Sequence, residues 1–439
     1  MVRPSYRKWV LLLVTTAVFA PVAAHGVQEV PVYALGEQDT VRLDLEAARR
    51  TAFESSPAFA AERERVAAAR GALREARTYP YNPQIDLEVP TARFDGDSRE
   101  YEASIVQEVE WAGQPGLRAR AAEFGLRRSG GELADAARAL RANVDRAYYA
   151  ALAADRRVEI AEEALTLNER LITAVRTQLR EGEISKLEAN LAEVESGRSR
   201  ALAMVARGDA LSATLELGRL LGLPPGVEVV LDPVFPAIPD PETVEPESLI
   251  TQALTVRPDL SALDAAVEES NTQVRLARRE AIPNITLGAL AERPEDDSES
   301  QLGVILGLPF PLWNRNQGVV DQRRADARRA ALERDAARIR IQAEVLQAYR
   351  IYAATAAAAD ALELEVLEPA RETRGLLETA YREGKIDLAT LLLVRNQLLD
   401  AELAYWATWL DWRAAWADLE SAAGETGPFR TNPDQGDRQ

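Results

Sequence analysis

Residue types that carry catalytic or redox chemistry are nearly missing from this sequence. It has no cysteine, one histidine, His25, and two methionines, Met1 and Met204. Disulfides, thiol nucleophiles and cysteine-based metal sites are therefore excluded, and a soft-metal site has almost no ligands. A Ser-His-Asp arrangement would depend on His25, and paired carboxylates occur only along expected helix surfaces. The sequence predicts a protein that is not an enzyme and that has no resident cofactor or metal.

The charge balance of the chain is strongly acidic. There are 52 Lys and Arg against 70 Asp and Glu, which gives a net charge of -18 over 439 residues. A leader that contains Arg3, Arg7 and Lys8 would leave 49 basic residues, a deficit of 21. This balance excludes a nucleic-acid partner. The 47% of hydrophobic residues are enough for a large core or two domains.

The first 24 residues have the pattern of a signal peptide. Three basic residues precede an apolar run from Trp9 to Ala20, and small residues follow before His25. The run is too short to span a bilayer as a helix, although a membrane anchor is the alternative interpretation. No later window approaches 18 uninterrupted apolar residues. We therefore expect an exported chain whose mature form begins near His25.

The sequence contains an internal repeat. Pro57 and Pro258 lie 201 positions apart, and Gly222 and Gly424 lie 202 apart. A register that drifts so little indicates duplication and not a short-period solenoid. The predicted halves are 43–222 and 247–424.

Three further segments lie outside the two halves. Residues 223–246 carry prolines that favour an extended crossing segment, and their interleaved apolar residues suggest packing and not a flexible linker. We expect an extended segment at 25–42 and a disordered tail at 425–439.

Each half is predicted to contain a helix followed by a β-hairpin. The helices, 43–79 and 247–281, stop at proline-bearing turns, and strictly alternating residues then predict hairpins at 83–111 and 283–311. Ile85, Leu87 and Ile105 mark the apolar face of the first hairpin. The carboxylates predicted for the opposite face are Asp86, Glu88, Glu102, Glu108 and Glu110.

The alternation in the strands fits either a transmembrane β-barrel or an ordinary antiparallel sheet that packs on its apolar face. Each strand has roughly 10 residues, the length that crosses an outer membrane when tilted. Export and the matched positions of the hairpins favour the membrane. Four strands would leave open edges in lipid, so the chain would have to oligomerise. Two copies would close a filled barrel and three would leave room for a pore, whose lumen the carboxylates would face.

Long helical hairpins follow the strands at 119–221 and 319–423. The first predicted helix has about 60 residues and would be on the order of 90 Å long, which implies coiled-coil packing. The hairpins turn at REGEIS (180–185) and REGKID (382–387).

This combination of repeat, β-hairpins and R-x-G-x-I-[S/D] turns resembles the outer membrane efflux protein family, the TolC-type channels, over residues 40–424. LGLPFPLWNRNQG (306–318) and YREGKID (381–387) are similar to the cobalt-zinc-cadmium branch. The resemblance implies a mostly α fold with a small β part. It further implies a homotrimer with a 12-stranded barrel in the outer membrane of a Gram-negative cell and a barrel of long helices in the periplasm.

The resemblance also implies a function and partners. The chain would be a passive exit duct for heavy-metal cations, working with a periplasmic adaptor protein and an inner-membrane RND-type pump. The alternative is a periplasmic coiled-coil structural or adaptor protein without a transmembrane barrel. An adaptor would carry one helical hairpin, whereas this sequence has two.

Residue by residue, the resemblance assigns the turns to adaptor docking at the periplasmic tips. These residues are Arg180, Gly182, Ile184, Ser185, Arg382, Gly384, Ile386 and Asp387. Glu188 and Tyr381 match gate positions, and for Glu188 the alternative interpretation is an ordinary surface carboxylate. The family's best-known channel has charged residues two, six and nine positions after the second tip glycine, where this chain has Ile386, Thr390 and Leu393. We therefore do not expect an acidic ring from the second half.

Overall fold

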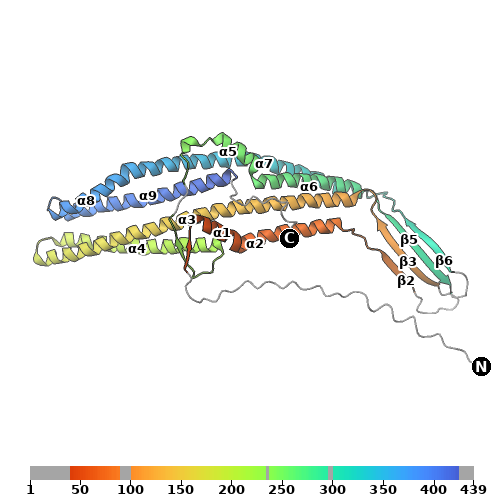
Figure 1. Cartoon of the computed structure of the whole chain (residues 1–439), viewed down its shortest axis with the longest axis horizontal. Helices are drawn as coiled ribbons and strands as arrows, with labels where there is room; N and C mark the ends of the chain where they lie inside the picture. Colours follow the sequence, from red (N-terminus) through yellow and green to blue (C-terminus); the bar gives the residue numbers. More distant parts are fainter. Residues whose placement is uncertain (1–39, 89–99, 234–236, 295–299, 425–439) are drawn as a thin grey trace, which may run out of the picture. The chain divides into compact units, whose positions relative to one another are not determined.

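The computed structural model describes residues 40–88, 100–233, 237–294 and 300–424. The predicted signal peptide, most of the N-terminal segment and the C-terminal tail lie outside these residues. Two matching sets of helices and strands make up the described chain (Figure 1). The predicted fold class, mostly α with a small β part and an internal repeat, is confirmed.

The first half runs from strand β1 to helix α4. Its elements are β1 (Thr40–Leu43), α1 (Leu45–Ser55), α2 (Pro57–Arg77), β2 (Gln84–Glu88), β3 (Glu100–Val109), α3 (Gln114–Glu181) and α4 (Lys186–Leu221). The crossing segment contains β4 (Glu228–Leu231) and the short 3-10 helix η1 (Pro241–Thr243). The second half contains α5 (Pro246–Val256), α6 (Pro258–Glu280), β5 (Ile285–Pro294), β6 (Gln301–Gly307), α7 (Gln317–Leu362), the π-helical turn η2 (Glu363–Leu367), α8 (Glu368–Arg382) and α9 (Leu388–Ala422).

Each half opens with two short helices, so the prediction of one continuous helix at 43–79 and at 247–281 is wrong. The breaks fall at Ser56 and Arg257, which have extended backbone with ψ of 117° and 125°. Each of these residues precedes a proline, and a proline disfavours helical backbone at the residue before it. Pro57 and Pro258 then occupy the first position of the new helix, where a missing N–H costs nothing.

The two helical hairpins differ in one respect. Helix α3 runs for 68 residues without interruption, including Gly130 and Gly131. Its second-half counterpart changes to a π-helical turn at Glu363–Leu367, just before Pro369. Since Pro369 has no N–H and its ring crowds the preceding turn, a regular α-helix does not pass this point. The predicted continuous helix from 319 to 381 is therefore interrupted.

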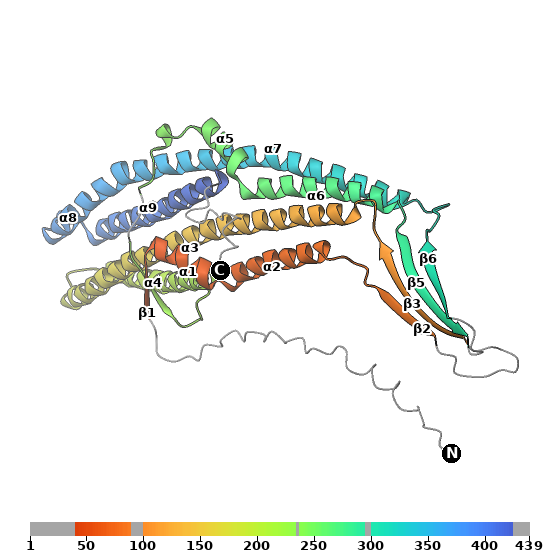
Figure 2. The same ribbon diagram turned by 45° about the vertical axis from the view of Figure 1, so that its right-hand side comes forward.

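Four helices lie side by side in the order α2, α3, α6 and α7 (Figures 1 and 2). Arg77 of α2 pairs with Glu123 of α3 at 2.9 Å, and Arg128 of α3 pairs with Glu269 of α6 at 3.0 Å. Arg340 of α7 reaches Asp259 of α6 at 3.4 Å. Toward the tips, α4 continues beside α3 (Figure 1). Helices α2 and α7 thus form the two edges of this layer.

The strands form one antiparallel sheet in the order β2-β3-β5-β6. Strand β3 pairs with β5 over ten residues, so the sheet joins the two halves. A separate parallel pair forms between β1 and β4, with Thr40 opposite Glu228. Val229 and Leu231 of β4 pack on the main core beside buried Tyr148 and Leu217. The part of the crossing segment that forms β4 is therefore packed on the core.

The glycine that ends each half lies against the break between the two short helices that open the same half. Gly222 follows α4 with φ of +72°, and a Cβ built there would lie 2.3 Å from the carbonyl oxygen of Ser55. Gly424 follows α9 with φ of +90°, and its Cβ would lie 2.9 Å from Val256. Both positions need glycine for backbone conformation and for space. The glycines of the repeat thus mark equivalent contacts.

Candidate functional site

The register of the sheet places its side chains on two distinct faces. Directly paired residues share a face, and Ile85 pairs with Ile105 while Leu287 pairs with Leu306. The apolar face is exposed within the chain, with Val304 at 87% and Ile85 at 69%. Among its described side chains, only Gln107 and Arg293 are polar, and they lie toward opposite ends of the sheet because β3 and β5 are antiparallel. The exposed apolar band therefore lies between two polar boundaries.

Three carboxylates form a row across the opposite face. Glu88 pairs with Glu102, and Glu102 pairs with Glu292 on the next strand. Gln301 of β6 completes the row. Asp86 lies on the same face, two residues before Glu88. Like charges directly opposite one another destabilise a sheet, so this row is unfavourable for an isolated chain.

Glu108 and Glu110 differ from the other predicted lumen carboxylates. Glu108 lies on the polar face and accepts a hydrogen bond of 2.7 Å from the side-chain amide of Asn284. Glu110 follows the last residue of β3, and its side chain is 3% exposed and ion-paired with Arg118. Within the described chain, Arg118 of α3 covers and neutralises Glu110, and the lumen position of this carboxylate stays a prediction.

The predicted tip residues lie in the two turns between long helices. Gly182 and Gly384 have φ of +77° and +69°, and a Cβ at either would meet no atom within 4 Å. Each is an exposed left-handed residue that reverses the chain. Arg180 donates to the carbonyl oxygen of Arg176 at 3.3 Å, and Arg382 donates to that of Glu378 at 3.4 Å. Both arginines thus bind the last turn of their own helix.

A capping box begins the helix after the first tip. The Ser185 hydroxyl accepts a hydrogen bond from the Glu188 backbone N–H at 3.2 Å, and the Glu188 carboxylate accepts the Ser185 backbone N–H at 2.8 Å. After the second tip, Asp387 accepts the Thr390 backbone N–H at 2.8 Å. Backbone and side-chain hydrogen bonds with Ser185 lower the pKa of Glu188, and side-chain and backbone hydrogen bonds with Thr390 lower the pKa of Asp387. Within the described chain, Glu188 is a capping residue, and its gate role stays a prediction.

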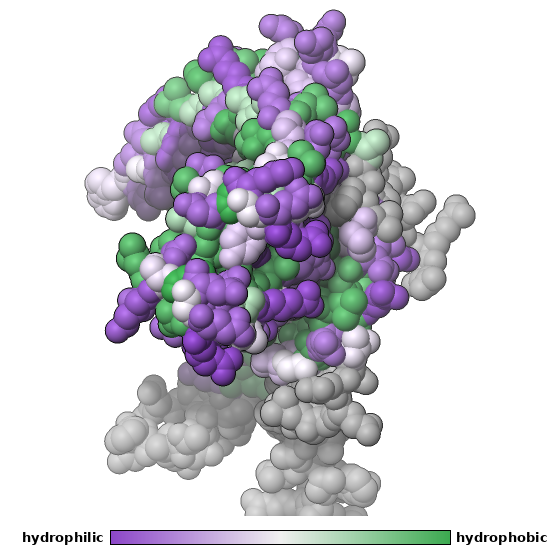
Figure 3. All heavy atoms as spheres, turned by 90° about the vertical axis from the view of Figure 1, so that its left-hand side faces the viewer, coloured by the Kyte–Doolittle hydropathy of each residue, from purple (hydrophilic) through white to green (hydrophobic). Residues whose placement is uncertain are grey.

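The two tips are packed against each other within one chain. Ile184 of the first tip and Ile386 of the second contact a shared cluster that contains buried Val175, Leu377 and Leu388. Tyr381 is half-buried at this cluster, where burial and the nearby charge of Glu188 raise its pKa. The structure therefore brings the predicted gate residues near each other. Hydrophilic side chains intermingle with smaller apolar patches on this end of the molecule (Figure 3).

We expect the first tip to loosen at acidic pH. Because the folded pKa of Glu188 is lowered, its contribution to stability is complete above the unfolded value of about 4.3 and is lost as pH falls through the folded value. Hydrogen exchange at the start of α4, corrected for intrinsic rates, should accelerate below that pH. Glu188→Ala should exchange faster than the parent at neutral pH and approach the parent's rate at the lowest pH, whereas Glu183→Ala in the same turn should match the parent.

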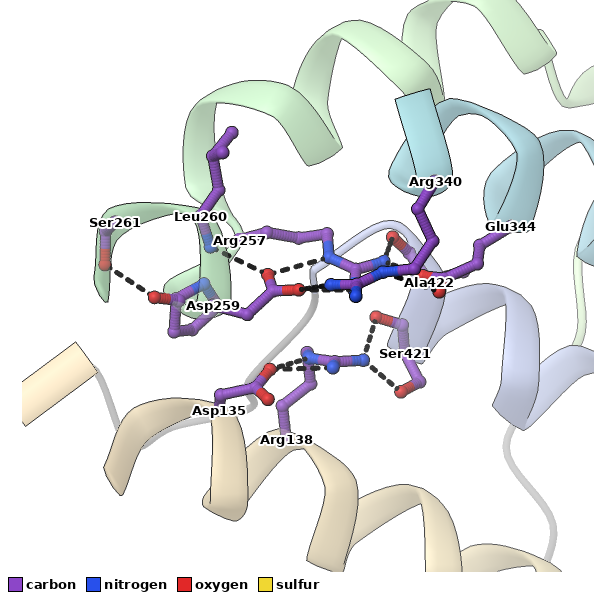
Figure 4. Close-up of polar contacts among 11 residues, drawn as sticks. Asp135, Arg138, Arg257, Asp259, Leu260, Ser261, Arg340, Glu344, Ser421 and Ala422 are labelled. Carbon is purple, nitrogen blue, oxygen red and sulfur yellow. Dashed lines mark hydrogen bonds and ion pairs between the residues drawn. The ribbon is translucent and has the colours of Figure 1, made fainter. Parts of the chain in front are cut away.

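Sequence interpretation missed a buried charge network midway along the chain (Figure 4). Arg257, 4% exposed, forms two hydrogen bonds with Asp259 at 2.8 and 3.0 Å and one with Glu344 at 2.8 Å. It also donates to the Ala422 carbonyl oxygen at 3.3 Å. Arg138 of α3 binds the carbonyl oxygen and hydroxyl of Ser421 at 2.9 and 2.7 Å. Two arginines thus hold the end of α9 against α3, α6 and α7.

The described residues contain no helix long and apolar enough to cross a membrane. Among the same residues, no group of three or more side chains of His, Cys, Asp or Glu is arranged to hold a metal ion.

The repeat also appears in comparison with known proteins. The family model for "Outer membrane efflux protein" matches this chain twice, at residues 48–223 and 249–425. This chain belongs to the outer membrane efflux protein family. The predicted family and the outer-membrane location are thereby confirmed, and this is a family of channels and not of enzymes. As a family member, the chain is an outer membrane efflux channel component.

Individual relatives are similar to this chain over most of its length. The cobalt-zinc-cadmium resistance protein CzcC of Cupriavidus metallidurans is 25% identical over 384 residues, which cover 87% of this chain and 89% of the relative. The outer membrane channel CmeC of Campylobacter jejuni superposes with a TM-score of 0.74 at 15% identity, covering 87% of this chain and 85% of CmeC. The structure of CusC superposes with a TM-score of 0.70 at 18% identity, and the match covers 90% of this chain and 95% of CusC.

Proposed function

We propose that three copies of this efflux protein form the exit duct of a tripartite system that moves heavy-metal cations from the periplasm to the outside. The observation that carries the proposal is the open four-stranded sheet with one exposed apolar face. Such a face suits lipid, and lipid does not tolerate unpaired strand edges. Closure by further copies satisfies these edges, and 12 strands leave room for a water-filled path.

Residues next to the sheet support its placement in the membrane. Phe310 and Trp313 follow β6 and are 79% and 85% exposed, and Trp111 follows β3 at 58%. Aromatic residues gather at the interfaces of transmembrane barrels because one end of the ring is apolar and the other tolerates water. Large exposed aromatics beside an exposed apolar face are costly in water, and their burial at the lipid boundary removes that cost.

The acidic row supports a cationic substrate. Glu88, Glu102 and Glu292 would line the path in each copy, so three copies would place nine carboxylates at one level. Their negative potential would raise the local cation concentration. The similarity to CzcC, whose name refers to cobalt, zinc and cadmium, points to the same class of substrate.

The two tips are the proposed contact with a periplasmic adaptor, which would link the duct to an inner-membrane RND-type pump. Their exposed glycines leave the ends of the hairpins slim, with open space around each Cα. Ile184 and Ile386 anchor the two turns on one core, so the tips are presented as a fixed pair. A gate formed by Glu188 and Tyr381 would lie directly beside this contact.

Two measurements test the proposal. The detergent-solubilised protein should have the mass of a trimer, and a monodisperse monomer would contradict the channel. Gly182→Arg and Gly384→Arg should each abolish metal export by cells while leaving the amount of protein in the outer membrane unchanged, since bulk at the tip blocks docking and positive φ disfavours arginine. Gly197→Arg, at an open position within α4, is the matched control and should export normally.

A further inference from the structure

One cation lies on the apolar face of the sheet. Arg293 is the only basic residue among the described residues of β2, β3, β5 and β6. It shares a face with Leu287, Ala289 and Ala291, because successive side chains of a strand alternate between the two faces. The proposed function places this face against lipid, so Arg293 is a charged side chain on the lipid-facing side of the sheet.

The described chain supplies no counter-charge for this arginine. Its side chain is exposed and forms no ion pair or hydrogen bond with any described residue. The carboxylates at the same level, Glu102 and Glu292, lie on the opposite face of the sheet. Its neighbours on its own face are small, since Ala291 precedes it by two positions and pairs with Ala103. The guanidinium is therefore accessible to a ligand that approaches from the lipid side.

The place of β5 in the sheet keeps Arg293 away from the contacts that would close a barrel. Strand β5 lies between β3 and β6, so it is not an edge of the sheet. Neighbouring strands lie about 4.8 Å apart, and the nearest strand of another copy would therefore be about 10 Å away, across β6. Closure by further copies thus leaves Arg293 facing lipid.

The position of Arg293 along its strand sets its depth in the membrane. The strands join the helices at the end of the sheet that contains Ile285, and Arg293 lies eight positions further along β5. This is about 27 Å along the strand, or about 20 Å of height for a tilted strand, which is most of the apolar band of a transmembrane barrel. The exposed aromatics Phe310 and Trp313 follow β6 at the helix end. With the helices in the periplasm, Arg293 therefore lies at the outer boundary of the band.

A phosphate group fits a cation in this position. The guanidinium is planar, keeps its charge at any working pH, and has paired N–H donors that match two phosphate oxygens. An arginine is costly in hydrocarbon and tolerated beside headgroups, and a charged residue within a membrane span indicates a specific partner. This chain lies in the outer membrane, whose outer leaflet consists mainly of a glycolipid with phosphates on its lipid A part.

We propose that Arg293 binds a phosphate of lipid A in the outer leaflet, once in each copy of the channel. The inference rests on the proposed membrane-spanning sheet and adds the lipid that its outer boundary recognises. The N–H groups of Arg293 donate to the phosphate oxygens. The bond fixes the depth of the sheet, because a shift inward takes the guanidinium into hydrocarbon, and a shift outward exposes Leu302 and Val304 to water.

Native mass spectrometry of the detergent-solubilised protein, titrated with diphosphorylated lipid A, tests this assignment. We expect one bound lipid A per copy. Arg293→Gln should weaken binding about tenfold or more, because it removes a charge-assisted hydrogen bond. Arg293→Lys should bind with intermediate affinity, since lysine keeps the charge and lacks the paired donors. The matched control is Arg350→Gln, which removes an exposed arginine of α7 away from the sheet and should bind like the parent.

Further probes separate the phosphate from the rest of the lipid. Lipid A whose phosphates have been removed should bind the parent and Arg293→Gln equally weakly. Neither inorganic phosphate nor phosphatidylglycerol should displace diphosphorylated lipid A from the parent at equal concentration, because the first has no apolar part and the second covers less of the apolar face. Displacement by phosphatidylglycerol would assign the site to a phospholipid and overturn the glycolipid.

The outcomes distinguish this inference from the proposed function. A trimer in which Arg293→Gln binds diphosphorylated lipid A as tightly as the parent would show that the apolar face alone holds the lipid. That result would overturn the Arg293 site and leave the channel intact. A monodisperse monomer in detergent would refute the channel, together with the membrane boundary on which this site depends.

Discussion

Arg257→Met should destabilise the folded chain by about 3–5 kcal/mol, the usual effect of removing one partner from a buried ion pair. The guanidinium is almost fully buried and bonds Asp259, Glu344 and the end of α9. Methionine has similar length but removes the closest cation of the buried Asp259 carboxylate, which then keeps only Arg340 at 3.4 Å and the Leu260 N–H at 2.9 Å. Denaturant unfolding followed by circular dichroism in detergent gives the measurement. A loss below about 1 kcal/mol, the size for exposed pairs, would refute a structural role for this network.

The pH dependence of the stability of Arg257→Met tests whether the buried Asp259 carboxylate causes the destabilisation. Burial alone would raise the pKa of Asp259, but the hydrogen bonds and charge of Arg257 outweigh burial and lower it. This carboxylate therefore stabilises the parent above its unfolded pKa and stops doing so as pH falls through the folded value. Without Arg257, burial raises the pKa, so the difference between parent and variant should shrink at acidic pH. Arg340→Met is the matched control, because Arg340 contacts Asp259 and Glu344 from a side chain that is 57% exposed.

Replacing Glu88, Glu102 and Glu292 together by glutamine should remove most of the cation selectivity of single channels. The three carboxylates lie in one row, so their potentials add at one level of the path. The permeability ratio of potassium to chloride, from reversal potentials in planar bilayers, should fall toward one. Replacing Glu242, Glu245 and Glu247 by glutamine changes net charge equally, away from the sheet, and should leave the ratio unchanged. Unaltered selectivity in the row variant, or anion selectivity in the parent, would refute the assignment of this face to the lumen.

Local patterns in the sequence were sufficient to predict the two β-hairpins and the two faces of their sheet. Alternation assigned Ile85 and Leu87 to one face of the sheet and Asp86 and Glu88 to the other, because strand side chains have a period of two. The same local reasoning missed the breaks at Ser56 and Arg257. Proline is accepted at the first position of a helix, so the apolar period continued across each break without a visible interruption.

Contacts between distant residues account for most of what the sequence did not reveal at the site. The row of Glu88, Glu102 and Glu292 depends on the register between β3 and β5, which belong to different halves. Arg257 and Glu344 are 87 positions apart, and nothing local distinguishes that arginine from others in the chain. Ser185 and Glu188, by contrast, have the spacing of a capping box, which is visible in the local sequence. The gate role of Glu188 was predicted from the family resemblance alone.

The parallel pairing of β1 with β4 has a consequence for the order of folding. Thr40 meets Glu228 across 188 positions, and closing a loop of that length costs about 5 kcal/mol in chain entropy. Four paired residues on their own do not compensate such a cost, so the pair forms only after α3 and α4 have brought its ends together. During synthesis, strand β1 precedes its partner β4 by the whole of the first half and stays unpaired until β4 follows. Strand β1 is thus among the last described elements to reach its native contacts and among the first to lose them.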